Sequence, residues 1–300
     1  MHWERYIKDF VSYLKIEKGL AENSILAYQR DVSLLATYFN NEKSKPEQVT
    51  YEQLKTFVAH LYDLGLSARS QARIISGIKQ FFRYLILERY IHIDPSELLE
   101  QPKLGRKLPE VLEIEEIDAL LAAIDLSMAE GERNHALLET LYSCGLRVSE
   151  LIGLRFSDLY FDEGFIRVIG KGNKERLVPV SPQVVKEINA YTAQSRLEVP
   201  IKKGQEHFIF LNRRGAALTR VMIFTIIKQL AQKIGLGKQI SPHTFRHSFA
   251  THLVEGGANL RAVQEMLGHE SITTTEIYTH LDQRFLRKAI LSHHPRNQGK

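Results

Sequence analysis

Apolar residues in the first hundred positions recur at the three- and four-residue spacing of amphipathic helices. The first set ends at Gly19 and consists of Trp3, Tyr6, Ile7, Phe10, Val11 and Leu14. Ser24, Thr50 and Ser67 each stand where a helix N-cap is expected, and they predict three more helices, the first of which runs to about Phe39. Four amphipathic helices of this length predict a small helical bundle.

The apolar periodicity lapses near residue 105, where proline, glycine and basic side chains gather. Such punctuation indicates a linker. We therefore expect a boundary at Gly105, with an N-terminal domain of residues 1–105 and a second domain of residues 106–300. The length of 300 residues agrees with two domains.

The second domain has a mixed pattern. Alternating residues in 165–170 (FIRVIG) and 176–180 (RLVPV) flank a Gly-Asn turn and predict a β-hairpin. Helical spacing covers roughly 114–125, 133–144, 147–154, 182–197 and 219–234, and most of the last hundred residues. The predicted fold class is mainly α, with a small β-hairpin or sheet in the second domain.

Composition and charge exclude several classes of protein. The hydrophobic fraction of 44% is ordinary for a globular protein, and no apolar run is long enough for a transmembrane helix. The N-terminus lacks the apolar core of a secretory signal, and the single Cys144 cannot form an internal disulfide or a cysteine-rich zinc site. We expect a cytoplasmic protein, and its net charge of +5 permits a nucleic-acid partner without requiring one.

A cluster of His and Arg residues opens one predicted helix near the C-terminus. Ser241 and Pro242 suit the N-cap and first positions, so His243 and Arg246 should project from the same side of the first turn. A helix N-terminus beside a guanidinium favours a bound phosphate. The alternative is a zinc helix through His243 and His247, but no Glu follows the first His and Arg246 would oppose the metal, so we expect no metal.

Four further features are weak when each is taken alone. Arg147 and Glu150 form an i, i+3 pair that would ordinarily be a surface salt bridge. Lys171 lies in the hairpin turn, where most lysines only face solvent. His269 follows a helix-ending glycine, and Tyr278 would ordinarily be a core residue of the next helix.

In combination, these residues resemble the tyrosine recombinases (the lambda-integrase family) in kind and in order. The motifs GLRVSEL, GKGNKER, HTFRHSFATHL and LGH…TTTEIYTH carry the resemblance, which covers essentially the whole chain and is greatest to recombinases of the XerD type. It implies an N-terminal core-binding helical domain, and an α+β catalytic domain that ends in a C-terminal tail.

The resemblance also implies a chemistry. Tyr278 attacks a DNA phosphodiester, forms a 3′-phosphotyrosyl link and releases the 5′-hydroxyl, without ATP or any other cofactor. Arg147 and Arg246 stabilise the charge of the pentavalent transition state, with His269 and the helix N-terminus at His243 as further donors.

Two groups would move protons in this reaction. The tyrosine hydroxyl has a pKa near 10 in model peptides, so it needs a base, for which we choose His243. Lys171 on the hairpin would protonate the leaving 5′-oxygen. Glu150 would orient Arg147 and His243, and we interpret His247 as structural.

The resemblance implies the partners as well. These are a double-stranded DNA site with two half-sites, a partner recombinase of the XerC type in a tetrameric synapse, and an activating DNA translocase of the FtsK type. The expected task is resolution of chromosome dimers at a dif-like site during chromosome segregation and cell division, with no membrane insertion. Arg69, Arg73 and Arg220 open predicted helices and are candidates to read bases, although each could be a plain surface arginine.

The segment beyond Tyr278 carries an apolar face with helical spacing, formed by Phe285, Leu286, Ala289 and Ile290. So short a helix must dock, either on its own domain or, as the resemblance implies, on a neighbouring protomer. The alternatives for the whole chain are a phage or mobile-element integrase, a type IB topoisomerase, a non-catalytic DNA-binding protein and an inert helical protein.

Overall fold

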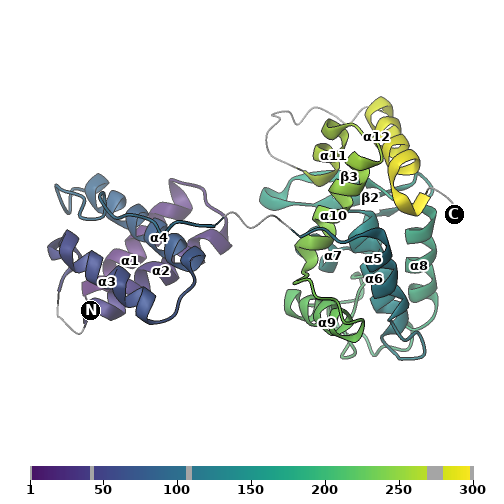
Figure 1. The fold of residues 1–300 in the computed structure, drawn as a ribbon, viewed down its shortest axis with the longest axis horizontal. Coiled ribbons are helices and arrows are strands. Elements are labelled where there is room, and N and C mark those ends of the chain that lie inside the picture. The colour runs from purple at the N-terminus through teal and green to yellow at the C-terminus, as the bar shows by residue number, and fades with distance from the viewer. Residues whose placement is uncertain (1, 41–43, 106–109, 269–279, 298–300) are drawn as a thin grey trace. The chain divides into compact units, whose positions relative to one another are not determined.

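The computed structural model describes residues 2–40, 44–105, 110–268 and 280–297. The chain divides into two compact units, Met1–Lys107 and Leu108–Lys300, so the division falls just beyond the expected position at Gly105. The helices and strands of each unit are drawn in Figure 1.

The N-terminal unit is a bundle of four helices around one apolar core. The helices are α1 (His2–Ile16), α2 (Glu22–Asn40), α3 (Tyr51–Asp63) and α4 (Ala68–Leu87), with a short 3-10 helix η1 (Pro46–Gln48) before α3. Trp3, Phe10 and Phe81 contribute stacked and edge-on ring contacts to the core. The amphipathic spacing therefore predicted the bundle correctly, because its apolar positions are the ones that face the other helices.

Two of the three predicted caps of this unit are confirmed. Thr50 accepts a hydrogen bond from the backbone N–H of Gln53, and Ser67 does the same for Ser70. The prediction for Ser24 is wrong, since α2 begins two residues earlier, at Glu22. The carbonyl of Ala21 already accepts from the N–H of Ser24 at 2.8 Å, so the helical hydrogen bonds start before that serine.

The C-terminal unit packs helices around a small antiparallel sheet. Its helices are α5 (Ile114–Ala122), α6 (Gly131–Ser143), α7 (Val148–Ile152), α8 (Pro182–Ala193), α9 (Arg220–Lys233), α10 (Pro242–Glu255), α11 (Leu260–Leu267) and α12 (His280–His293). The strands are β1 (Leu159–Tyr160), β2 (Phe165–Ile169) and β3 (Glu175–Pro179), in the order β1-β2-β3. Short 3-10 helices are η2 (Phe156–Asp158), η3 (Lys171–Asn173) and η4 (Pro295–Asn297).

The predicted hairpin is formed by β2 and β3, which pair from Phe165 opposite Pro179 to Ile169 opposite Glu175. Gly172 and Asn173 adopt positive φ angles of 72° and 60° in the turn, the conformation that favours Gly and Asn. The sequence did not predict β1, because two residues are too few for an alternating pattern. Helix α6 lies at the centre of the unit, against α8 and α10 (Figure 1).

Helix α12 lies on its own unit, against α10, α11 and β3. Of the predicted apolar face, Leu286, Ala289 and Ile290 are buried, but Phe285 is 49% exposed. The structure thus shows the docking of this helix on its own domain, and donation to a neighbouring protomer stays a prediction.

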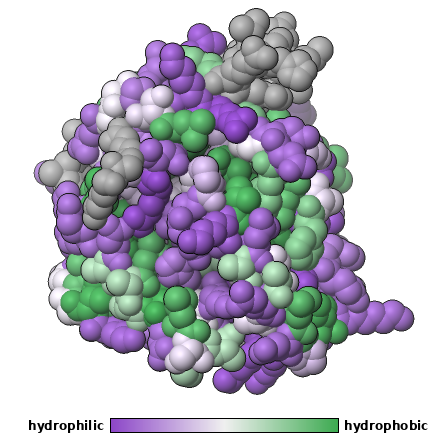
Figure 2. All heavy atoms as spheres, turned by 90° about the vertical axis from the view of Figure 1, so that its right-hand side faces the viewer, coloured by the Kyte–Doolittle hydropathy of each residue, from purple (hydrophilic) through white to green (hydrophobic). Residues whose placement is uncertain are grey.

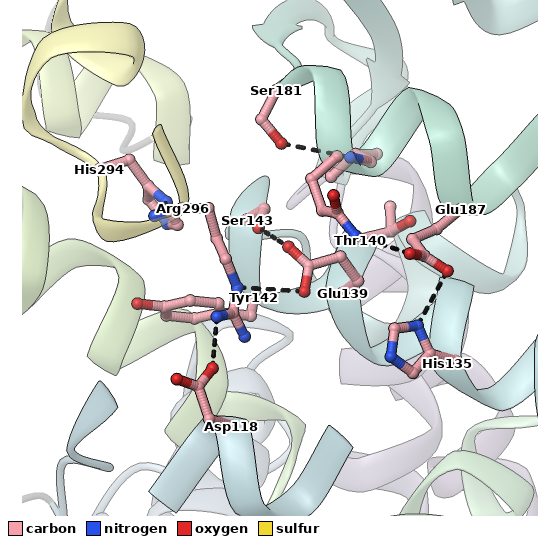
Figure 3. Close-up of polar contacts among 12 residues, drawn as sticks. Asp118, His135, Glu139, Thr140, Tyr142, Ser143, Ser181, Glu187, His294 and Arg296 are labelled. Carbon is pink, nitrogen blue, oxygen red and sulfur yellow. Dashed lines mark hydrogen bonds and ion pairs between the residues drawn. The ribbon is translucent and has the colours of Figure 1, made fainter. Parts of the chain in front are cut away.

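The tail after α12 is held by polar contacts with α5 and α6 (Figure 3). The Arg296 guanidinium donates to Asp118 and, at 3.2 Å, to Glu139, and its carbon lies 5.5 Å from the centroid of the Tyr142 ring. His294 is fully buried beside that ring, at a centroid distance of 4.9 Å. These contacts hold His294 and Arg296 against the core of the unit.

The face of the C-terminal unit seen in Figure 2 is mostly hydrophilic, with small separate apolar patches. Within the described ranges, no helix combines the length and the apolar character needed to cross a bilayer.

Candidate functional site

Glu150 is the centre of a buried polar cluster at the start of α7. Arg147 is the N-cap residue of that helix, and its backbone N–H donates to Glu150 Oε2 at 2.8 Å. The Arg147 guanidinium donates to Oε1, also at 2.8 Å. The Glu150 side chain is only 1% exposed, so this pair differs from the surface salt bridge that the spacing alone would suggest.

A second arginine, Arg176 on β3, forms a two-pronged ion pair with the same carboxylate. Its Nη1 and Nη2 atoms donate to Oε1 and Oε2 of Glu150, each at 2.8 Å, and the Arg176 side chain is 6% exposed. Burial on its own raises the pKa of Glu150. The hydrogen bonds and charge of Arg176, with those of Arg147, outweigh it and hold the pKa below its usual range.

No role was predicted for Arg176 from the sequence, although the strand contained a signal. Arg176 and Val178 are two positions apart on β3, so their side chains point to the same, buried face of the strand. A charged side chain therefore occupies a position where the alternating pattern predicts an apolar one. A buried arginine requires hydrogen-bond acceptors for its guanidinium, and those of Arg176 include the Glu150 carboxylate. That partner, Glu150, lies in a different element, which the pattern of one strand does not identify.

Arg246 on α10 joins the cluster as its third guanidinium. It donates to the carbonyl of Gly145 at 2.7 Å and to the carbonyl of Leu267, and its Nη1 lies 3.8 Å from Glu150 Oε2. Burial and, next, the charge of Arg147 lower the pKa of Arg246 to about 10, so the group stays charged at neutral pH. Three guanidiniums and one carboxylate give this cluster a net charge of +2.

The same three arginines hold the C-terminal end of α11. Arg176 donates to the carbonyl of Met266 at 2.7 Å, Arg246 to that of Leu267, and Arg147 to that of Gly268 at 3.3 Å. Gly268 has a φ of 65°, and a Cβ there would lie 3.2 Å from Cδ of Arg176. Only glycine combines this backbone conformation with so close an approach.

His243 and Lys171 lie on the two elements predicted for them. Helix α10 begins at Pro242, as expected, but His243 is exposed while Arg246 is buried. All four hydrogen bonds to the Glu150 carboxylate come from Arg147 and Arg176, so the geometry does not bear out the expectation that Glu150 also orients His243. Lys171 opens η3 at the hairpin tip, and its side chain is not among those that the structure describes.

His269 and Tyr278, the predicted donor and nucleophile, lie outside the described residues. His247, the other half of the zinc alternative, is half-buried on α10. In the part of the chain that the structure describes, no three His, Cys, Asp or Glu side chains group closely enough to hold a metal ion.

The three candidates for base reading differ in their surroundings. Arg69, in the first turn of α4, and Arg220, the first residue of α9, are exposed. Arg73 pairs with Asp31 at 2.5 Å, and that carboxylate is 3% exposed in the bundle. All three side chains are exposed, but Arg73 also has a structural partner that links α4 to α2.

Comparison with protein families matches residues 110–284 to the phage integrase family, and residues 7–89 to the phage integrase N-terminal SAM-like domain. The chain belongs to the phage integrase family. The tyrosine recombinase XerD of Staphylococcus epidermidis is 43% identical over 291 residues, which cover 97% of this chain and 98% of that protein. The XerD of Staphylococcus aureus is also 43% identical, over 98% of this chain and 99% of its own length.

Solved structures agree with this membership. The XerH recombinase in a post-cleavage complex with a palindromic difH substrate is 26% identical, with a TM-score of 0.70 over 95% of this chain and 84% of that one. A lambda integrase dimer bound to a core site has the same TM-score at 18% identity, over 92% of this chain and 100% of that one, and supports the fold alone. The family membership and the full-length similarity to XerD identify this chain as a tyrosine recombinase, a site-specific enzyme that breaks and rejoins DNA strands.

Proposed function

We propose that the Glu150 cluster binds the scissile phosphate of double-stranded DNA, and that Tyr278 is the nucleophile. The tyrosine oxygen attacks phosphorus, a 3′-phosphotyrosyl bond forms, and the bond to the 5′-oxygen breaks. Attack by a 5′-hydroxyl reverses these steps and releases the tyrosine. The phosphoester count is unchanged, so no ATP and no resident cofactor is required.

The observation that carries the proposal is the net charge of +2 on the cluster of Arg147, Glu150, Arg176 and Arg246. A phosphodiester carries one negative charge, and its pentavalent transition state carries two. A fixed, largely buried group of cations stabilises that added charge more than water does. Many phosphoryl-transfer enzymes place Mg²⁺ there, and here the guanidiniums take that role.

The proton steps are assigned to residues around this cluster. His243, exposed in the first turn of α10, takes the proton of the tyrosine hydroxyl. Lys171, at the tip of the hairpin, donates a proton to the leaving 5′-oxygen. His269 follows Gly268, whose carbonyl accepts from Arg147, and it adds a donor to the phosphate.

We also propose the biological task. The recombinase acts on a site of two half-sites similar to dif, with a partner of the XerC type in a tetrameric synapse and a translocase of the FtsK type. It resolves chromosome dimers in the cytoplasm during segregation and cell division. This proposal is supported by the XerD name of the full-length relatives and by the difH substrate named for the XerH complex.

The task is tested by selecting genomic fragments with the purified protein and sequencing them. Enrichment of a two-half-site element near the replication terminus is the expected result. Enrichment at the ends of a mobile element would instead identify an integrase. Recombination is then assayed on plasmids with one or two copies of the selected element, since a topoisomerase relaxes a plasmid with one copy and a recombinase requires two.

A further inference from the structure

We infer that Arg176 is a positioning residue, which saturates the Glu150 carboxylate and so leaves Arg246 and part of Arg147 available to the DNA phosphate. The inference rests on the function proposed above, because it concerns how the same cluster receives its substrate. The motif GKGNKER ends in Arg176 but gives it no role, and the role is assigned here from the contacts of its side chain.

The first step is the hydrogen-bond capacity of Glu150. An ionised carboxylate has about four acceptor positions, two on each oxygen. Oε1 accepts from Nη1 of Arg147 and Nη1 of Arg176, and Oε2 accepts from the backbone N–H of Arg147 and Nη2 of Arg176. All four positions are filled, and Arg176 fills one on each oxygen.

Second, because the carboxylate is saturated, Arg246 makes no hydrogen bond to it. Its Nη1 lies 3.8 Å from Oε2, within range of an ion pair but beyond a hydrogen bond. Its two hydrogen bonds go to the backbone carbonyls of Gly145 and Leu267. A guanidinium has five N–H donors, so Arg246 keeps donors for a phosphate as long as the carboxylate offers it no vacant position.

The third step separates Arg176 from the residues that touch DNA. Its Nε donates to the carbonyl of Met266, both terminal nitrogens donate to Glu150, and the side chain is 6% exposed. Arg147, by contrast, is 33% exposed. Arg176 is therefore held inside the cluster, where it adds its charge to the group and positions the hydrogen-bond donors of its neighbours.

Removal of Arg176 has a definite consequence in this geometry. One acceptor position opens on each Glu150 oxygen, and the buried carboxylate must find new donors because an unpaired buried charge is costly. Arg246 is near enough to fill the position on Oε2. It would then turn toward the carboxylate and lose donors that the phosphate requires.

The test is single-turnover cleavage by the full chain at saturating DNA, with the dissociation constant of the DNA measured in parallel. Arg176→Met is expected to slow cleavage by roughly 10²–10³-fold, the loss typical of one charge-stabilising donor. DNA affinity should change by only a few-fold. Arg176→Lys retains the charge but not the two-pronged geometry, so its cleavage rate should lie between those of the wild type and Arg176→Met.

A second substrate distinguishes a defect in positioning the phosphate-binding arginines from a general loss of structure. A methylphosphonate at the scissile position lacks one negative oxygen, so a defect that acts through charge stabilisation should shrink by at least about tenfold on it. Arg196→Met is the matched control, because Arg196 is also 6% exposed but donates to the backbone carbonyls of Glu206, Phe208 and Ile209. Its defect should be equal on both substrates.

The outcomes are distinguishable. If the wild type does not cleave DNA, the proposed function fails. If the wild type cleaves and Arg176→Met shows no defect, or an equal defect on both substrates, the inference about Arg176 is overturned. If Arg176→Met does not fold, the rate defects on ordinary DNA and on the methylphosphonate are compared for Arg176→Lys instead. An equal defect on both substrates again overturns the inference.

Discussion

Acidification should destabilise the C-terminal tail through a single buried histidine. The His294 ring is 0% exposed and lies 4.9 Å from the Tyr142 ring and 5.5 Å from the Phe249 ring, centroid to centroid. Its Nε2 atom has no hydrogen-bond partner in the described part of the chain. Burial, followed by the positive charge of Arg296, lowers its pKa to about 3.

The sign of the effect follows from the two states of the chain. An unfolded histidine titrates near 6.5, whereas folded His294 resists protonation until about pH 3. Its contribution to the free energy of unfolding is therefore complete above about pH 6.5 and declines as the pH falls toward 3. Between pH 7 and pH 5 the loss from His294 is about 2 kcal/mol, or about thirtyfold in an opening equilibrium.

The assay is hydrogen exchange followed by mass spectrometry on α12 and α6, at pH 7 and pH 5, with each rate divided by its intrinsic chemical rate. His294→Phe keeps an aromatic ring and removes the titrating group. On going from pH 7 to pH 5, the wild type should therefore lose about thirty times more exchange protection in these helices than the variant does. The fluorescence of Trp3, in the N-terminal unit, gives an internal control that should be the same for both proteins. An identical loss of protection in wild type and variant would refute the reasoning.

Three further changes test other parts of the account. Arg296→Met breaks the ion pairs of the tail with Asp118 on α5 and Glu139 on α6, and it should lower the free energy of unfolding by about 3 kcal/mol. Arg287→Met, an exposed change on α12, should lower it by at most about 0.5 kcal/mol, and equal costs in urea titrations would contradict this. Lys171→Ala should cleave ordinary DNA slowly but recover on a 5′-thio leaving group, and recovery to the same degree by Arg147→Ala would remove Lys171 as the acid. Arg220→Ala should relax base preference at one position of the site, at a cost of about 1–3 kcal/mol, whereas a uniform loss of affinity across unrelated sequences would make Arg220 a phosphate contact.

Local signals predicted most of the fold. The helices of the N-terminal bundle were recognised because their apolar residues recur every three or four positions, and Thr50 and Ser67 because a cap acts within one turn. Ser24 failed as a cap because nothing in the short stretch before it prevents the helix from starting earlier, at Glu22. The strand β1 was not predicted because its two residues are extended only through their pairing with β2.

The contacts of the site could be predicted where both residues lie in one motif. They could not be predicted where the tertiary fold brings distant residues together. Arg147 and Glu150 are three residues apart, and the structure joins them directly. Arg176 reaches Glu150 from 26 positions away and Met266 from 90, so no local pattern reports these contacts. The contact of Arg296 with Glu139, across 157 positions, was missed for the same reason.

The central claim is that Tyr278 joins covalently to the DNA that the Glu150 cluster activates. The direct measurement incubates the full chain with a suicide substrate nicked near the cleavage position, digests the trapped adduct and maps the attachment by mass spectrometry. The account predicts a nucleotide linked through its 3′-phosphate to Tyr278, and predicts that Tyr278→Phe binds the same DNA without forming an adduct. Attachment at another residue, or an adduct that persists in Tyr278→Phe, would contradict it.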